Sequence, residues 1–162
     1  MEVDVKIATA NDIQMLIKSR FDYFAFEEWE VTTEQKFVIE SSLQQYFLKR
    51  LNDSFFAAFI EVDNKIASLA FMAISEAPAN PFSPTGKFGT IYNVLTYPEY
   101  RKKGYATKVM SKLIEVAKLQ NLPHLQLSSS ELGKPLYEKL GFQIVEPSKE
   151  PSRYVPMKLS LI

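Results

Sequence analysis

YPEYRKKGYATKVM, residues 97–110, joins a strand pattern to a helix pattern through a short basic loop. The strand ends before Pro98 and the helix begins near Gly104, so little chain remains for the connection. The first N–H groups of a helix lack partners within it, and the helix dipole makes that end positive. Because Gly104 has no Cβ atom, an anion can approach the backbone there, or the residue can take a positive φ. The stretch predicts either a phosphate-binding corner or a solvated basic turn in which Gly104 serves the geometry alone.

The charge and the residue sizes around this corner also suit a polyphosphate. Arg101, Lys102 and Lys103 add positive charge, and Ala106 keeps the next approach to the backbone small. Two other phosphate-binding patterns do not fit, because the chain has no G-x-x-x-x-G-K-[ST] and no G-x-G-x-x-G after its first strand. A P-loop NTPase and a dinucleotide-binding fold are therefore disfavoured.

The composition is that of one ordinary globular domain, which we expect to span residues 1–162. Hydrophobic residues make up 46% of the chain and aromatic residues 13%, which is enough to form a core. Lys plus Arg equals Asp plus Glu, so a global basic field for nucleic acid is absent. With no cysteine and one histidine, the chain lacks the usual zinc ligands, and we expect no metal.

The termini and apolar runs indicate where the protein acts. MEVDVKI at the N-terminus lacks the basic-then-apolar pattern of a secretory signal. No apolar run approaches the roughly 20 residues of a membrane span. We expect a cytoplasmic protein that does not contact a membrane, and we leave open whether it is a monomer or a homodimer.

The order of the secondary-structure patterns predicts a mixed α/β sheet. The order is strand, helix, helix, three strands, helix, strand, helix, strand, strand, and the strand patterns cover residues 3–7, 55–62, 65–74, 88–96, 124–129, 142–145 and 155–161. Three consecutive antiparallel strands exclude a purely parallel, doubly wound sheet. The strand–helix–strand unit over residues 88–129 requires one parallel pair. We therefore expect a largely antiparallel sheet with helices on both faces.

Three segments together resemble the GNAT superfamily of acetyl-CoA-dependent N-acetyltransferases. RKKGYA, residues 101–106, matches the family motif [R/Q]-x-x-G-x-[G/A], and NVLTYPEYR, residues 93–101, is similar to the strand and loop before it. GKPLYEKLGF, residues 133–142, is similar to the family's fourth helix and following strand. The match at motif level spans residues 91–142. The resemblance implies a GNAT-like sheet whose parallel pair is splayed, and an enzyme that acetylates a primary amine.

The resemblance also implies where acetyl-CoA binds as a cosubstrate. Backbone amides of the basic loop would bind the pyrophosphate, at Lys102, Lys103, Gly104, Tyr105, Ala106 and Thr107. Pantetheine would lie in the gap of the splayed pair, against the backbone of Val94, Leu95 and Thr96. Ser130 stands where many members have an asparagine that contacts pantetheine, and serine is shorter.

The chemistry requires an acid for the leaving thiolate and a base for the amine. A CoA thiol resembles cysteine, with a pKa of about 8.5, so a neutral tyrosine hydroxyl can protonate the thiolate. Tyr137 matches the family's acid position, with an amphipathic core tyrosine as the alternative. Asn93 would orient the acceptor or a water molecule, although an asparagine at a strand end is commonly structural. The resemblance implies direct attack by the amine in a ternary complex.

The base is not identified by the sequence. Glu27, Glu28, Glu30 and Glu76 are candidates, and each is equally compatible with a solvated carboxylate. His124 begins a strand on the far side of a helix from the basic corner, and we expect it at the surface or at a sheet edge.

Residues 21–30 combine five aromatic residues with four acidic ones, in a region that forms one wall of the acceptor site in the family. Aromatic faces and carboxylates together suit a cation, so a small amine is the expected acceptor, enclosed by the loop over residues 76–87 across the cleft. The alternative is that the aromatic residues, Trp29 among them, belong to the core. Acetylation of a protein N-terminus or lysine, a non-catalytic acyl-CoA sensor and a nucleic-acid binder remain alternative functions.

Overall fold

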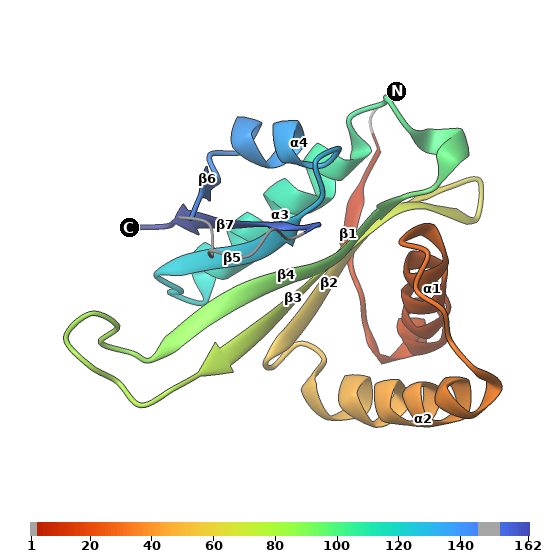
Figure 1. Ribbon diagram of the computed structural model, residues 1–162, viewed down its shortest axis with the longest axis horizontal. Coiled ribbons are helices and arrows are strands. Elements are labelled where there is room, and N and C mark those ends of the chain that lie inside the picture. Colours follow the sequence, from red (N-terminus) through yellow and green to blue (C-terminus); the bar gives the residue numbers. More distant parts are fainter. Residues whose placement is uncertain (1–2, 146–152) are drawn as a thin grey trace.

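The structure is a computed structural model that describes residues 3–145 and 153–162, and these residues form one seven-stranded sheet (Figure 1). The strand order is β1-β2-β3-β4-β5-β7-β6. The strands are β1 (Val5–Ile7), β2 (Phe55–Val62), β3 (Lys65–Glu76), β4 (Lys87–Thr96), β5 (His124–Ser129), β6 (Gln143–Ile144) and β7 (Val155–Ser160). The helices are α1 (Ile13–Phe26), α2 (Thr33–Arg50), α3 (Tyr105–Leu119) and α4 (Lys134–Lys139), with short 3-10 turns at Ala10–Asp12 and Pro98–Tyr100.

The strand directions confirm the predicted mixed sheet. β1 to β4 pair antiparallel in sequence order, β4 pairs with β5 in parallel, and β7 lies antiparallel between β5 and β6. The α3 crossover makes the parallel pair possible, because parallel neighbours need a long connection. The first and sixth strands are shorter than the alternating pattern suggested.

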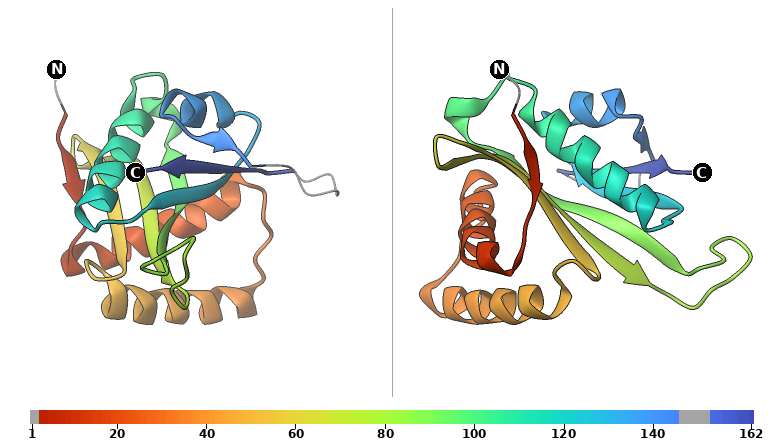
Figure 2. Two further views of the ribbon diagram at one scale, coloured as in Figure 1. Left: turned by 90° about the vertical axis from the view of Figure 1, so that its left-hand side faces the viewer. Right: turned by 180° about the vertical axis from the view of Figure 1, so that it is seen from behind.

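The helices cover both faces of the sheet, as predicted. Figure 1 and the two views of Figure 2 show α1 and α2 on one face and α3 and α4 on the other. The six residues Phe55–Ile60 of β2 are all buried because both faces of this strand are covered. Ala58 and Ile60 pack toward α3, whereas Ala57 and Phe59 pack toward α1 and α2.

The α2 side of the core is aromatic. Phe47 of α2 packs against Phe55 and Phe71, with ring centroids 5.1 Å and 5.9 Å away. Thr32 begins the helix with a capping box, since its side chain accepts from the Gln35 N–H and the Gln35 side chain accepts from the Thr32 N–H. Within α2, Phe47 is the one fully buried residue, and Ile39, Leu43 and Tyr46 on the same side of the helix are half-buried.

Within the described residues, no helix is long and apolar enough to cross a membrane. The same residues contain no group of three or more histidine, aspartate or glutamate side chains placed to hold a metal ion.

Candidate functional site

The sheet opens between β4 and β5. The two strands pair at Gly89 with Leu125 and at Thr90 with Gln126, and beyond these pairs they separate. β4 then keeps β3 as its neighbour and β5 keeps β7. Backbone groups of β4 that face β5 after Thr90 have therefore lost their strand partner, and such groups require another one. The predicted splay of the parallel pair is confirmed.

A bulge in β4 lies beside this gap. Leu69 of β3 pairs with Leu95 of β4, and Phe71 pairs with Tyr92. Between these two pairs β4 has one residue more than β3, which makes a β-bulge. Asn93 takes φ 57° in this bulge, a left-handed conformation that asparagine adopts more readily than most residues. The bulge directs the Asn93 side chain toward α1.

The Asn93 side chain is buried, with one of its two polar atoms paired. Its Oδ1 accepts a hydrogen bond from Nη1 of Arg20 at 3.4 Å. Its Nδ2 has no hydrogen-bond partner among the described residues. Because buried polar groups are nearly always paired, this amide is a candidate donor to a bound molecule.

The basic corner has the backbone geometry expected of an anion site. Gly104 takes φ 78° and directly precedes α3, and Lys102 takes φ 62°. A Cβ atom at Gly104 would meet nothing within 4 Å. The first hydrogen bond of α3 runs from the Lys108 N–H to the Gly104 carbonyl at 3.2 Å, so the N–H groups of residues 105–107 precede it. These groups have no acceptor within the helix and can bind an anion.

A cavity of about 610 Å³ connects this corner with the gap between the strands. Its lining contains nearly all residues expected at the cosubstrate site, namely Val94, Leu95, Thr96, Lys102, Gly104, Tyr105, Ala106, Thr107 and Ser130. Lys103 is exposed and lies outside this lining. The Arg101 guanidinium lies 5.7 Å from the Phe26 ring centre and donates from Nε to the Thr96 carbonyl at 3.0 Å. Arg101 thereby holds the corner against the end of β4.

Ser130 shapes the turn before α4. Its hydroxyl oxygen accepts from the Gly133 N–H at 3.2 Å, and the Ser129 hydroxyl donates to the Ser130 carbonyl at 2.7 Å. The hydroxyl hydrogen of Ser130 remains able to donate into the cavity.

Tyr137 lies on α4, where the two strands have parted. The residue is 8% exposed, and its ring packs edge-on against Phe142 at 5.9 Å. A Cβ atom at Gly133 would approach its Cε2 to 3.2 Å, so a larger residue there would push the ring. Burial, with Tyr23 and Glu27 nearby, raises the pKa of Tyr137 above its ordinary value of 10.0. The hydroxyl is therefore a proton donor that stays neutral.

A second cavity, of about 680 Å³, lies on the α1 side of the gap. It is lined by α1, by β4 and β5, by β7 and by the segment that precedes β7. The two cavities share five lining residues: Tyr23, Val94, Ser128, Tyr137 and Tyr154. They therefore meet at the Tyr137 side chain.

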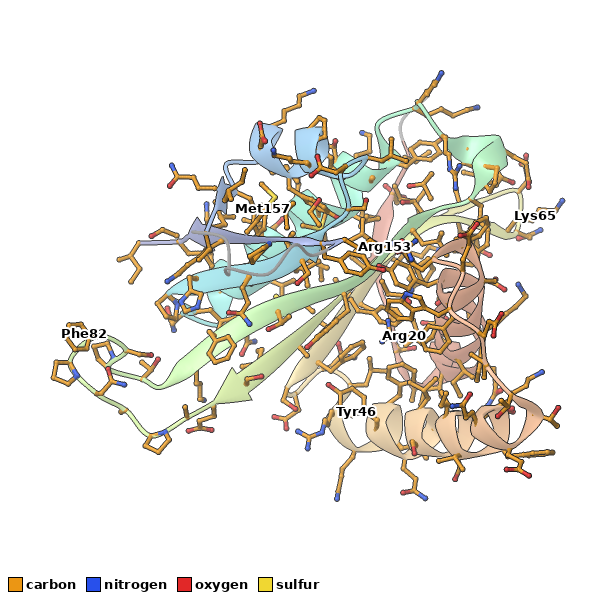
Figure 3. All side chains as sticks on the ribbon, viewed as in Figure 1. Arg20, Tyr46, Lys65, Phe82, Arg153 and Met157 are labelled. Carbon is orange, nitrogen blue, oxygen red and sulfur yellow. The ribbon has the colours of Figure 1, made fainter. Side chains whose placement is uncertain are left out.

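Arg20 enters the second cavity from α1 (Figure 3). Its guanidinium lies 4.8 Å from the Phe24 ring centre and 5.8 Å from that of Tyr23. Burial lowers the pKa of Arg20 from its ordinary value, and an arginine nevertheless stays protonated at neutral pH.

A chain of hydrogen bonds ties the end of α1 to the segment before β7. The Tyr154 hydroxyl donates to Oε2 of Glu27 at 2.8 Å and accepts from Nε1 of Trp29 at 3.1 Å. Arg153 donates to the Glu27 carbonyl at 3.1 Å. The Trp29 ring stacks on Phe24 at 5.5 Å. Trp29 thus packs against the buried Phe24 and also lines the second cavity.

The carboxylates expected around the acceptor are mostly elsewhere. Glu28, Glu30 and Glu76 are exposed and line neither cavity, whereas Glu27 lines the cavity of the basic corner. No residue of the loop over 77–86 lines either cavity. Figure 3 shows Phe82 of this loop at the end of the molecule remote from Arg20. The loop connects the last residue of β3, Glu76, to the first residue of β4, Lys87. The expectation that this loop encloses the acceptor is wrong.

His124 is not at a sheet edge. It begins β5, which lies between β4 and β7, and its ring stacks on Phe88 at 5.5 Å. It is half-buried and lines the second cavity. Burial, and then the charge of Lys158, lower the pKa of His124 from 6.5.

Comparisons with known proteins agree with this geometry. The model of the acetyltransferase (GNAT) family matches residues 16–142. A predicted acetyltransferase from Clostridium acetobutylicum, solved with acetyl-CoA, is 30% identical with a TM-score of 0.81, over 93% of this chain and 96% of that one. No curated protein matches the chain.

Two more distant structures share the fold. A GCN5-related N-acetyltransferase from Ralstonia eutropha JMP134 is 20% identical, with a TM-score of 0.74 over 93% of this chain and 99% of that one. The PaiA N-acetyltransferase from Thermoplasma acidophilum, solved in complex with coenzyme A, is 14% identical, with a TM-score of 0.64 over 99% of both chains. The chain belongs to the GNAT family of acetyltransferases, and it is an acyltransferase enzyme.

The sequence reasoning missed two residues of the site. Arg20 lies four residues after Leu16 and four residues before Phe24, both of which are buried, so it is on the same side of α1 as they are. A charged residue in an apolar stripe was the signal that could have found it. Tyr154 gave no such signal, since its partners Glu27 and Trp29 are distant in the chain.

Proposed function

We propose that this enzyme transfers an acetyl group from acetyl-CoA to the primary amine of a small molecule, by direct attack in a ternary complex. One observation carries the proposal: two separate cavities meet at Tyr137, in the opening between β4 and β5. One cavity begins at the anion-binding corner and the other does not. Such an arrangement lets two substrates bind at once and react where the cavities join.

The residues of the corner and the gap fit acetyl-CoA. Tyr105, Ala106 and Thr107 would donate backbone N–H groups to the pyrophosphate, and the open space at Gly104 leaves room for its oxygens. The pantetheine arm carries amide groups, and these would pair with the unpartnered backbone of β4 near Val94. The bound cosubstrate would supply an acetyl group activated as a thioester.

Backbone donors of β4 on the side of the gap would bind the acetyl oxygen as its negative charge develops. Fixed N–H groups in a site shielded from water stabilise such charge strongly. The bulge at Asn93 changes the direction of the strand at this point, so the donors need not follow the regular alternation of a ladder.

Tyr137 would give its proton to the leaving sulfur. Its raised pKa keeps the hydroxyl protonated, so a proton is available to the sulfur as the C–S bond breaks. A thiol with a pKa of about 8.5 is the stronger acid of the two, so this transfer is uphill and Tyr137 must regain its proton afterwards. Of the four glutamates considered as a base, Glu27 is the one that lines a cavity, and its carboxylate is hydrogen-bonded to Tyr154 at 2.8 Å. We propose that Glu27 is the base, which accepts the proton of the attacking amine through Tyr154 or a water molecule.

Release of CoA thiol in the presence of an amine panel tests the proposal. The panel contains small amines and peptides with free N-termini or lysines, and calorimetry measures CoA binding separately. Amine-dependent thiol release with a small amine supports the proposal. Binding of CoA without thiol release under any amine would instead make the protein a sensor. Turnover confined to peptides would overturn the small-molecule part.

A further inference from the structure

The charges that line the second cavity do not suit a polycation. The charged side chains among its described lining residues are those of Arg20 and Lys158, with His124 beside them. No described aspartate or glutamate lines this cavity. A second positive group on the acceptor would therefore meet like charge there.

Arg20 in particular lacks a counter-ion. No described carboxylate lies within ion-pair distance of its guanidinium, whose contacts are Asn93 Oδ1 and the rings of Tyr23 and Phe24. Arg20 is half-buried, and a partly desolvated charge without a partner is costly, so a protein that keeps one usually pairs it with something. The guanidinium has five N–H donors, and one weak bond to Asn93 leaves most of them for a ligand.

Asn93 supplies an independent observation. Its Nδ2 is buried, lies in the lining of the same cavity and has no hydrogen-bond partner among the described residues. Its Oδ1 contacts Arg20, so the unpaired amide and the unpaired guanidinium donors are neighbours. Adjacent N–H donors of this kind match the oxygens of a carboxylate or a phosphate.

We propose that the acceptor is a small amine that also carries a carboxylate or phosphate group, and that Arg20 and Asn93 bind this anion. The inference rests on the proposed function and specifies the substrate class of the same site. In the reaction the amine nitrogen forms a bond to the acetyl carbon and the C–S bond breaks. Starting from the neutral amine, the nitrogen loses one proton to Glu27 or water and the sulfur takes one from Tyr137. Return of the first proton to Tyr137 completes the balance.

Matched pairs of amines test this substrate class. Amino acids are compared with the amines left after removal of their carboxylate, and phosphorylated amino alcohols with the unphosphorylated alcohols. Thiol release from acetyl-CoA gives kcat/KM for each member. We expect the anionic member of at least one series to exceed its neutral partner by about 10- to 100-fold, the range for hydrogen bonds to charged groups. The two series distinguish a carboxylate from a phosphate.

Arg20→Gln removes the charge and keeps a polar side chain of similar length. We expect it to erase the preference by raising KM for the anionic amine more than for the neutral one. Arg20→Lys should keep part of the preference, since lysine retains the charge and loses the fork of donors. Arg50→Gln is the matched control, because Arg50 is exposed on α2 and lines neither cavity.

The melting temperature separates ligand binding from a structural role. If Arg20 is held for a ligand, Arg20→Gln removes an unpaired, half-buried charge, and its melting temperature should equal or exceed that of the wild type. A clear fall in melting temperature, or equal losses for both members of every pair, would overturn the inference.

The outcomes also separate this inference from the proposed function. Acetylation that favours the neutral amines, or CoA binding with no acetylation of any anionic amine, would overturn the inference. Acetylation of neutral amines would leave the proposed function standing. Failure to bind CoA at all would contradict the proposed function itself.

Discussion

Tyr137 is the residue at which the two cavities meet, and its role can be tested by removing one oxygen atom. Tyr137→Phe keeps the ring that packs against Phe142, so the fold and the affinity for CoA should be preserved. We expect kcat to fall by about 10²- to 10⁴-fold, the usual contribution of general acid catalysis. Single-turnover kinetics with saturating acetyl-CoA measures the chemical step. A fall of less than about threefold in that step would exclude Tyr137 as the acid.

At the residue scale, a residue could be predicted from the sequence when it belongs to a local motif, and its conformation or burial could not when these depend on distant parts of the chain. Tyr137 and Ser130 were predicted because they lie in or beside a motif whose spacing is local, and both line the cavity of the basic corner. Asn93 was named, but its left-handed conformation was not predicted, since a bulge depends on the register of β3 against β4. The unpaired Nδ2 of Asn93 follows from burial by α1, which is a tertiary effect.

At the scale of elements, the corner before α3 was predicted in detail because its signals are local. Gly104 takes a positive φ, as its lack of a Cβ atom suggested, and the helix begins at the next residue. The wall formed by Arg153 and Tyr154 was not predicted, because its hydrogen bonds join residues about as far apart as the chain permits. The loop over 77–86 was expected across the cleft from residues 21–30, but it precedes the start of β4 at Lys87, whereas the sheet opens only after Thr90.

Two substitutions at Gly104 distinguish the effect of blocking the anion site from the effect of straining the backbone. Gly104→Val adds branched bulk at the anion site and is also strained at φ 78°, whereas asparagine tolerates this conformation. We expect both variants to raise the Kd for CoA by at least about tenfold, or about 1.4 kcal/mol. Only Gly104→Val should also lower the melting temperature. Calorimetry and thermal melting measure the two effects, and unchanged affinity in folded Gly104→Asn would remove the phosphate site.

At the scale of the whole molecule, Gly89 lies where the two parts of the sheet are joined. It pairs with Leu125, and a Cβ atom here would approach Leu125 Cδ2 to 2.5 Å and Leu122 Cδ1 to 3.2 Å. Both leucines are buried, so they cannot move away freely. We expect Gly89→Ala to destabilise the protein by about 1–3 kcal/mol, the usual cost of overpacking a core. Thermal melting should show a fall of several degrees, and an unchanged melting temperature would mean that the join is not tightly packed.

Buried tyrosines make the stability of the whole molecule sensitive to alkaline pH. Burial raises the pKa of Tyr137, of Tyr97 with a contribution from its hydrogen bond to Asp22, and of Tyr23 to about 12. An unfolded tyrosine releases its proton near pH 10, while these folded ones retain theirs, so the folded state binds more protons. The contribution of these tyrosines to the free energy of unfolding should therefore be constant below about pH 9 and fall between about pH 10 and 12. Denaturant melts at each pH measure this fall. In Tyr137→Phe it should be shallower, and a rise in stability over this range would contradict the assignment.

Two residue pairs hold β4 to β5, and this has a mechanical consequence. Beyond these pairs, the two sides of the sheet are joined by the shared core under α3 rather than by ladder hydrogen bonds. A cosubstrate lying in the opening would connect both halves by its own amide groups and would act there as a short additional strand. At a concentration a hundred times its Kd, such a ligand adds about 2.7 kcal/mol to the stability of the fold. Under the proposed function, a cosubstrate in the opening would thus also form one wall of the cavity in which the second substrate is positioned.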